Sequence, residues 1–130
     1  MPKENSHHLQ ILVAEDDPLL AATVDDFLTQ EGFRVSISAD GQEALEMASR
    51  TPIAALLTDL RMPRLDGVSL VRRLRETRPE LPIVVMTGYA PDDWRSTLQR
   101  QGEGPLILLE KPIRLASLMQ ALLQVLGSRA

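Results

Sequence analysis

Short apolar runs alternate with amphipathic segments along most of this chain, which predicts a parallel sheet covered by helices. Four of the runs are almost continuously apolar, as expected for strands that are buried on both faces. These four are residues 9–14, 53–58, 82–86 and 106–109. A further run, residues 33–38, alternates apolar with polar side chains and predicts an edge strand with one more polar face.

Helix-start and helix-stop residues fill the gaps between these runs. An Asp-Pro pair, Asp17 and Pro18, is typical of a helix N-terminus. Asp40, with a glutamate three residues later, has the spacing of a capping box. The five predicted helices start after Asp17, Asp40 and Asp66, at Pro91 and at Leu115, and Gly32 and Pro79 end the first and third. The sequence therefore predicts an α/β domain in which strands and helices alternate.

The composition fits one domain and argues against several classes of protein. A length of 130 residues suffices to bury a core, and no run approaches the roughly 20 apolar residues that cross a bilayer. Without cysteine the chain has neither disulfides nor thiolate metal sites, which favours a cytoplasmic location. The net charge of -4 and the scarcity of aromatic side chains argue against direct nucleic-acid binding.

The pattern shows no internal repeat and no linker. We predict one domain over residues 9–127, between a disordered polar tail at 1–8 and a C-terminal tail at 128–130. The first tail lacks the apolar centre of a secretory signal, and we interpret its two histidines as tail residues. Four arginines lie close together, at positions 72, 73, 75 and 78, and we interpret them as a solvated helix face.

Polar residues that could carry chemistry follow four of the apolar runs. They are Glu15 and Asp16 after 9–14, Asp59 after 53–58, Thr87 after 82–86 and Lys111 shortly after 106–109. The carboxyl ends of parallel strands meet at one edge of a sheet, where open α/β proteins place their sites. Three carboxylates, a hydroxyl and an ammonium would then converge, and that set suits a divalent metal and a phosphoryl group.

Each of these residues also has an ordinary structural explanation. An aspartate after a strand often caps a helix, a threonine favours a strand, and a surface lysine lays its stem along apolar neighbours. For Asp59 the helix-cap alternative is weakened, because Pro63 interrupts the connection and Asp66 is available as the cap. Each alternative is reasonable alone, but all of them together at four strand ends are improbable.

The acidic residues point to Mg2+ in particular. Adjacent acids such as Glu15 and Asp16 repel each other and are tolerated best when a cation binds them. Mg2+ prefers oxygen ligands, keeps several waters, and takes one or two carboxylates together with phosphate oxygens. Asp16 and Asp59, on neighbouring strands of the predicted sheet, match that demand.

In combination, order and spacing these motifs resemble those of the receiver domain of bacterial two-component response regulators, related to the chemotaxis response regulator. The matching motifs are Ile-Leu-Val-Ala-Glu15-Asp16-Asp17-Pro, Thr58-Asp59-Leu-Arg-Met-Pro63-Arg-Leu-Asp66-Gly67, Met-Thr87-Gly-Tyr and Lys111-Pro112. The similarity covers residues 9–127. It implies a flavodoxin-like (βα)5 three-layer sandwich whose parallel sheet has the strand order 2-1-3-4-5.

The resemblance also implies a role in signal transduction by a phosphorelay. Asp59 would accept a phosphoryl group from a phosphohistidine of a sensor histidine kinase or phosphotransfer protein, and the aspartyl phosphate would switch the surface offered to a downstream protein. Thr87 would donate a hydrogen bond to one phosphoryl oxygen, and Lys111 would pair with another. The peptide bond between Lys111 and Pro112 is expected to be cis. Such a module is not a turnover enzyme, beyond self-phosphorylation and slow autodephosphorylation.

By the same resemblance, four residues would hold the Mg2+ cofactor. They are Asp16 and Asp59 through their carboxylates, Glu15 through a water, and Arg61 through its backbone carbonyl. The chain departs from the family pattern at Glu15, where an aspartate is common, and at Leu108, where the family usually has a switch aromatic. A leucine cannot swing a phenol between solvent and core, so that form of readout is in doubt.

Several details of the output follow as expectations. Phosphorylation should reorganise the loop after Thr87, with the change read through Tyr89, the weak helix at 91–101 and the last helix. Arg61 and Tyr89 are expected to govern the access of water to the phosphoryl group. Trp94 is either a core residue or part of a partner surface. The last helix offers Leu118, Met119 and Leu122 for a homodimer.

Two other functions remain as alternatives. An aspartate-nucleophile, Mg2+-dependent phosphatase generally has a second aspartate two residues after the first, where this chain has Arg61. A degenerate receiver would bind proteins without being phosphorylated; Leu108 favours that alternative, whereas the retained acidic residues, Thr87 and Lys111 speak against it. The sequence leaves open whether the chain acts alone or belongs to a hybrid kinase or longer regulator.

Overall fold

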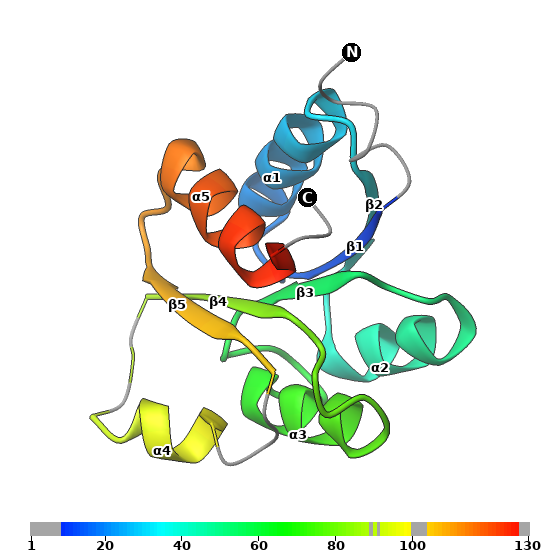
Figure 1. Ribbon diagram of the computed structural model, residues 1–130, viewed down its shortest axis with the longest axis vertical. Helices are drawn as coiled ribbons and strands as arrows, with labels where there is room; N and C mark the ends of the chain where they lie inside the picture. The colour runs from blue at the N-terminus through cyan, green and yellow to red at the C-terminus, as the bar shows by residue number, and fades with distance from the viewer. Residues whose placement is uncertain (1–8, 89, 91, 100–103, 128–130) are drawn as a thin grey trace.

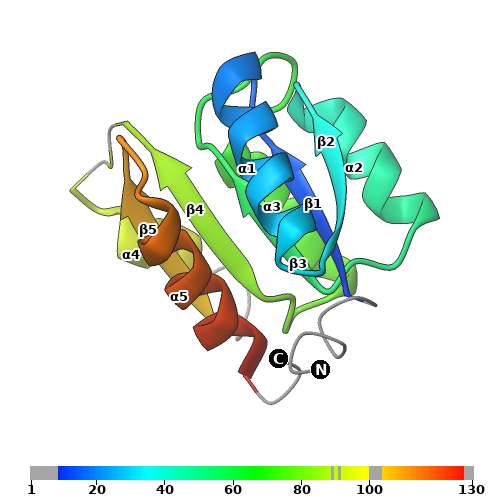
Figure 2. The ribbon, with the colours of Figure 1, turned by 90° about the horizontal axis from the view of Figure 1, so that it is seen from above.

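A parallel sheet runs through the middle of the protein, whose computed structural model describes residues 9–88, 90, 92–99 and 104–127 (Figure 1). Its strands are β1 (Gln10–Ala14), β2 (Arg34–Ser38), β3 (Ala55–Thr58), β4 (Ile83–Thr87) and β5 (Leu106–Glu110). They lie in the order β2-β1-β3-β4-β5, with every neighbouring pair parallel. The predicted flavodoxin-like fold and strand order are confirmed, and Figure 2 shows the strands running side by side in one direction.

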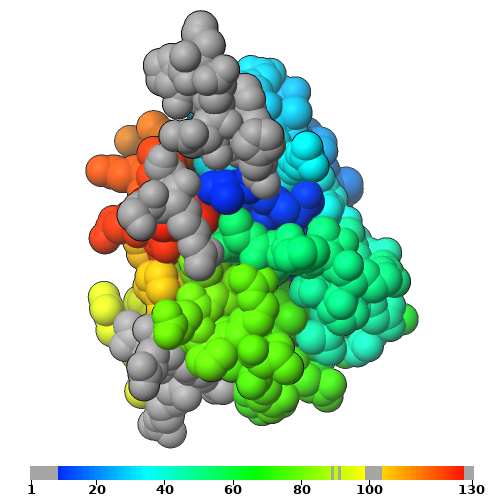
Figure 3. All heavy atoms as spheres, turned by 45° about the vertical axis from the view of Figure 1, so that its right-hand side comes forward, coloured from blue at the N-terminus to red at the C-terminus, as the bar shows by residue number. Residues whose placement is uncertain are grey.

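Helices cover both faces of the sheet and complete a three-layer sandwich. The helices are α1 (Pro18–Gln30), α2 (Gly41–Arg50), α3 (Gly67–Thr77), α4 (Trp94–Gln99) and α5 (Leu115–Leu126). In Figure 1, α1 and α5 lie on one side of the sheet, and α2, α3 and α4 lie on the other. Helices α2 and α3 pack against each other, and their surfaces adjoin in the space-filling view of Figure 3.

The pleat of the central strands explains why their sequences are apolar throughout. In β1, Ile11 and Val13 face the core beneath α1 and α5, whereas Leu12 and Ala14 face the core beneath α2 and α3. All four side chains are fully buried. A strand covered on both faces has no polar side to alternate with. By contrast, β2 at the edge keeps one exposed and three half-buried residues, as its alternating sequence predicts.

The predicted helix caps are also confirmed. Asp17 accepts a hydrogen bond from the Leu19 amide at 3.0 Å, and Asp40 and Asp66 cap α2 and α3 in the same way. Most boundaries fall within two residues of the prediction. β3 starts two residues later, at Ala55, where pairing with Ile11 of β1 begins, and α4 starts three residues later, at Trp94. The peptide bond between Lys111 and Pro112 is cis.

The interpretation of the four arginines as a solvated face is wrong for Arg75. Its side chain is only 2% exposed, and its guanidinium donates hydrogen bonds to the carbonyl oxygens of Leu81 and Pro105. The helical spacing places it on the same face as Val71, which packs on the sheet. Burial lowers the pKa of the Arg75 guanidinium below its ordinary value.

The proposed dimer contact through α5 is also wrong for two of its three residues. Leu118 and Leu122 are fully buried against the sheet, and only Met119 of the three keeps partial exposure. A fully buried side chain cannot contact a second subunit while the domain stays folded. The apolar stripe of α5 therefore belongs to the core.

Some expectations fall on residues outside those described. They include the tails at 1–8 and 128–130, Tyr89, and parts of the connections around α4. Within the described residues, no helix has the length and apolar character required to cross a membrane.

Candidate functional site

Three carboxylates meet where β1 and β3 end. Glu15 and Asp16 directly follow β1, and Asp59 directly follows β3. The register pairs Ala14 with Thr58, so the residues after them are neighbours across the sheet edge. One carboxylate oxygen from each acid lies within 4.8 Å of those from the other two. The predicted convergence of these acids is confirmed.

The three acids differ in their exposure to water. Glu15 is 1% and Asp59 6% exposed, whereas Asp16 is exposed. Burial raises the pKa of the Glu15 carboxyl above its ordinary value of 4.5, despite the hydrogen bond it accepts from the Asp17 amide and the attraction of Lys111. Ionising Glu15 therefore costs free energy in this site, and a bound cation would offset that cost.

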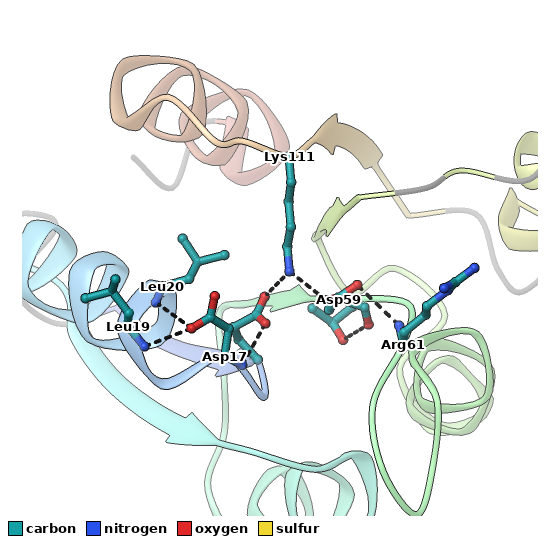
Figure 4. Close-up of polar contacts among 8 residues, drawn as sticks. Asp17, Leu19, Leu20, Asp59, Arg61 and Lys111 are labelled. Atoms are coloured by element: carbon teal, nitrogen blue, oxygen red, sulfur yellow. Dashed lines mark hydrogen bonds and ion pairs between the residues drawn. The ribbon is translucent and has the colours of Figure 1, made fainter.

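Lys111, which directly follows β5, forms ion pairs with two of the acids. Its Nζ atom lies 2.7 Å from Oδ2 of Asp59 and 3.0 Å from Oε1 of Glu15 (Figure 4). Burial works to lower the pKa of the Lys111 ammonium, but its hydrogen bonds and charge interactions with Asp59 and Glu15 outweigh burial, and the net pKa is raised. Lys111 is therefore held in its charged form beside Asp59.

The charges of this cluster favour binding of a divalent cation. When all three acids are ionised, the single ammonium of Lys111 leaves two negative charges without compensation. Oxygen donors in a small, partly buried group are the ligands that Mg2+ takes, together with waters and phosphate oxygens. The donor set therefore fits Mg2+ and lacks the histidine and thiolate ligands that transition metals favour.

The connection after Asp59 folds back over the site. The Arg61 amide donates a hydrogen bond to Oδ1 of Asp59 at 3.2 Å, and the Arg61 side chain extends away from Asp59 (Figure 4). Gly67 begins α3, and a Cβ atom there would collide with the backbone oxygen of Asp59. Because Asp66 caps α3, the side chain of Asp59 is not used as a helix cap and faces Lys111.

Thr87 ends the neighbouring strand β4 at the same edge of the sheet. Its side chain is 1% exposed, and its backbone oxygen accepts a hydrogen bond from the Lys111 amide at 2.7 Å. The backbone of Thr87 thus fixes the start of the segment from which Lys111 reaches the acids. Thr87 and Asp59 therefore lie at the ends of two neighbouring strands, β4 and β3.

Leu108 of β5, at the position where receiver domains usually have a switch aromatic, and Trp94 of α4 line the same surface hollow. Leu108 is half-buried and packs with the partly buried Trp94 against the core beneath α2 and α3. The Arg95 guanidinium lies 4.8 Å from the centre of the Trp94 ring. Trp94 is therefore partly a core residue, with the remainder of its surface open.

No sequence motif singles out Arg64. This residue lies in the connection between β3 and α3, has a φ of 68°, and forms an ion pair with Asp40 at the start of α2. No local motif signals such a contact, because 24 residues separate the two partners. Only the packing of α2 beside the connection brings them together.

Comparison with known proteins gives a consistent result. Residues 11–123 match the response regulator receiver domain family. A response regulator receiver protein of Anaeromyxobacter sp. is 38% identical over 102 residues, which cover 78% of this chain and 42% of the relative. The chain spans about half the length of the curated relatives that it matches.

Solved structures resemble the chain over nearly its whole length. The receiver domain of the sensor histidine kinase PA1611 from Pseudomonas aeruginosa PAO1, with a magnesium ion coordinated in its active site cleft, is 33% identical with a TM-score of 0.79, covering 92% of this chain and 98% of that one. A response regulator receiver protein from Sinorhizobium medicae WSM419 is 35% identical with a TM-score of 0.82, covering 94% and 97%.

Proposed function

Since the chain belongs to the response regulator receiver domain family, we propose that it is the phosphoacceptor module of a two-component phosphorelay, with Asp59 as the acceptor. The observation that carries this proposal is the position of the Asp59 carboxylate. It lies 2.7 Å from a lysine ammonium and within 4.8 Å of two further carboxylates. An acceptor carboxylate needs a nearby positive charge, because the negatively charged phosphoryl group of the donor would otherwise be repelled.

Four residues would hold Mg2+ in this proposal. They are the carboxylates of Asp16 and Asp59, Glu15 through a water, and the backbone carbonyl of Arg61. The clustering of the three acids supports the first three assignments, and the fold of the connection over Asp59 supports the fourth. When bound, Mg2+ supplies positive charge that neutralises the phosphoryl oxygens.

The protein's own groups would carry out the transfer by positioning and charge. One oxygen of Asp59 forms a bond to phosphorus while the phosphorus–nitrogen bond of the phosphohistidine breaks. The electron pair of that bond stays on the imidazole nitrogen. Lys111 pairs with one phosphoryl oxygen of the product and the Thr87 hydroxyl donates to another, so the aspartyl phosphate is held by charge and hydrogen bonds.

The partners follow from the same proposal. A sensor histidine kinase or phosphotransfer protein would donate the phosphoryl group, and a downstream protein would read the switched surface. We place this exchange in the cytoplasm, with no direct contact to nucleic acid by this domain. A homodimer, if it forms, needs a surface other than Leu118 and Leu122, which are buried.

Phosphorylation of the protein by acetyl phosphate tests the assignment. With Mg2+, the intact mass should rise by one phosphoryl group, and beryllofluoride or removal of Mg2+ should prevent the rise. Asp59→Asn should remain unmodified. Asp66→Asn is the matched control, because asparagine still caps α3 and the site is otherwise unchanged.

The same experiment separates the alternatives. An Asp59→Asn protein that still gains a phosphoryl group would rule out the proposed acceptor. A protein-binding domain that works without phosphorylation would stay unmodified in every condition. Steady release of phosphate from many small phosphate esters would instead identify a phosphatase.

The conformational change that follows phosphorylation would reach the partner surface through the segment that joins β4 to β5. Ala90, Asp92 and Trp94 line a surface hollow together with Leu108–Glu110 of β5, directly beyond Thr87. Phosphorylation should loosen or reorder α4, because this six-residue helix is the shortest among the described residues and has little of its surface buried. Unchanged amide exchange over 92–99 after addition of beryllofluoride and Mg2+ would refute this route.

A further inference from the structure

We propose that Arg64 and Asp40 are positioning residues that hold the connection between β3 and α3 in the form that binds Mg2+. This inference rests on the proposed function, because that connection carries Asp59 and Arg61. The carboxylate of Asp40 receives the Arg64 guanidinium on both oxygens, with Nε 3.2 Å from Oδ2 and Nη2 3.3 Å from Oδ1. Arg64 thereby ties the connection to the first turn of α2.

The backbone of Arg64 shows why such a tie is needed. Its φ of 68° lies in the left-handed region, and it is the one non-glycine residue with positive φ among those described. A side chain with a Cβ atom is disfavoured there, so the surrounding structure has to hold it in place. The two contacts with Asp40 are the interactions of its side chain that can do this.

The first turn of α2 touches the connection at its backbone as well. The Gly41 amide donates a hydrogen bond to the Pro63 oxygen at 3.3 Å, and a Cβ atom at Gly41 would collide with the Leu65 oxygen. Residues on both sides of Arg64 therefore rest against α2. The connection is closed by a hydrogen bond of 3.0 Å from the Gly67 amide to the Leu60 oxygen, so Arg61 and Arg64 belong to one loop.

Asp40 is itself connected to the other half of the site. The Ser38 hydroxyl donates a hydrogen bond to the backbone carbonyl oxygen of Asp40 at 2.6 Å. The Glu15 amide in turn donates one to the backbone carbonyl oxygen of Ser38 at 2.9 Å. Ser38 is 1% exposed, so this path runs through a fixed part of the fold. Asp40 is thus connected by its ion pair to the loop of Asp59 and Arg61, and by hydrogen bonds through Ser38 to the strand end that supplies Glu15.

A double-mutant cycle on Mg2+ binding tests the inference without phosphorylation. Calorimetric titration with Mg2+ would compare the wild type with Asp40→Asn, Arg64→Ala and the double variant. Asparagine preserves the helix cap while removing the charge, so α2 should stay intact. Each single change should raise the Mg2+ dissociation constant about two- to fivefold, the range available to an exposed ion pair, and the double variant should show no further loss.

Further measurements distinguish positioning from simple loss of stability. Arg64→Lys should recover part of the affinity, and amides of residues 60–66 should exchange faster in Arg64→Ala without Mg2+. Arg72→Ala, which removes an exposed arginine from α3, should bind Mg2+ like the wild type.

Three outcomes would overturn the inference. They are unchanged Mg2+ affinity in both single variants, losses that add in the double variant, and weaker binding with no change in exchange over 60–66. A wild-type protein that binds no Mg2+ would instead remove the metal site of the proposed function, and the inference with it.

Discussion

The Nζ atom of Lys111 lies 2.7 Å from Oδ2 of Asp59, although 52 residues separate the two in the chain. The same atom is 3.0 Å from Oε1 of Glu15, so one ammonium interacts with two acids. Lys111 therefore lowers the negative potential that would attract a cation, while it supplies the charge that a phosphoryl group requires. The two effects have opposite consequences for metal binding and for phosphoryl transfer.

Replacing the ammonium should separate those effects. Lys111→Met should bind Mg2+ about tenfold more tightly, because a positive charge next to the ligands is removed. Phosphorylation by acetyl phosphate at saturating Mg2+ should become slower, because the charge opposite the phosphoryl oxygen is lost. Calorimetry measures the first effect and the rate of mass gain the second.

Arg34→Met is the matched control for this change. Arg34 is an exposed residue at the opposite end of the sheet, so its loss alters the net charge equally without changing the site. Equal changes of Mg2+ affinity in the two variants would show that net charge, rather than the position of Lys111, is responsible. Weaker Mg2+ binding by Lys111→Met would contradict the argument.

Glu15 should make the stability of the metal-free protein depend on pH. Because burial raises its pKa in the folded state, folded Glu15 binds more protons than unfolded Glu15, and the free energy of unfolding falls as pH rises from about 4.5 through the raised pKa. Glu15→Gln lacks this loss and should unfold at a higher temperature than the wild type at pH 7 in EDTA. The difference between the two unfolding temperatures should shrink below pH 4.5, because the Glu15 carboxyl is then protonated and as neutral as the glutamine amide.

Mg2+ should reverse the order of stability. At a free Mg2+ concentration one hundred times the dissociation constant, binding stabilises the wild type by about 2.7 kcal/mol. Glu15→Gln should gain much less, because a neutral amide replaces the charged carboxylate that would hold Mg2+ through a water. Thermal unfolding of both proteins with and without Mg2+ measures this, and an equal Mg2+ effect in both would exclude Glu15 from the site.

Thr87 offers a test of the proposed hydroxyl donor. Thr87→Val keeps the shape of this buried side chain and removes its hydroxyl, so phosphorylation should slow on the order of 100-fold, as for loss of one donor to a developing charge. Thr87→Ser keeps the hydroxyl and should retain most of the rate. Mg2+ affinity should be the same in both variants, and an equally slow Thr87→Ser would point to packing rather than to the hydroxyl.

Much of the fold and the site was predictable because the relevant signals are local. Continuous apolar runs identify β1, β3 and β4 as buried strands, but the run at 106–109 forms the edge strand β5, which is only half-buried. Asp17, Asp40 and Asp66 identify helix starts through their own backbone neighbours. The meeting of Asp16 with Asp59 follows from strand parallelism, which the alternation of elements already implies.

The features that could not be predicted depend on contacts distant in the sequence. Burial of Arg75 depends on carbonyl oxygens of Leu81 and Pro105, which come from two other connections. An arginine with apolar neighbours at helical spacing gives no sign of such acceptors, so the sequence predicts it on the exposed face with the other arginines. The pairing of Arg64 with Asp40 is missed for the same reason.

Arg75 gives the strongest prediction for stability. Arg75→Ala should lower the free energy of unfolding by about 2–4 kcal/mol, because it leaves a cavity and takes the hydrogen-bond donor from two carbonyl oxygens. Part of the loss is offset, since a guanidinium whose Nε and Nη1 atoms have no hydrogen-bond acceptor is costly to bury. Arg72→Ala, a matched change on the exposed side of α3, should stay within about 0.5 kcal/mol of the wild type. Urea unfolding of the two variants in EDTA measures the difference, and equal stabilities would mean that the buried guanidinium contributes nothing net to the fold.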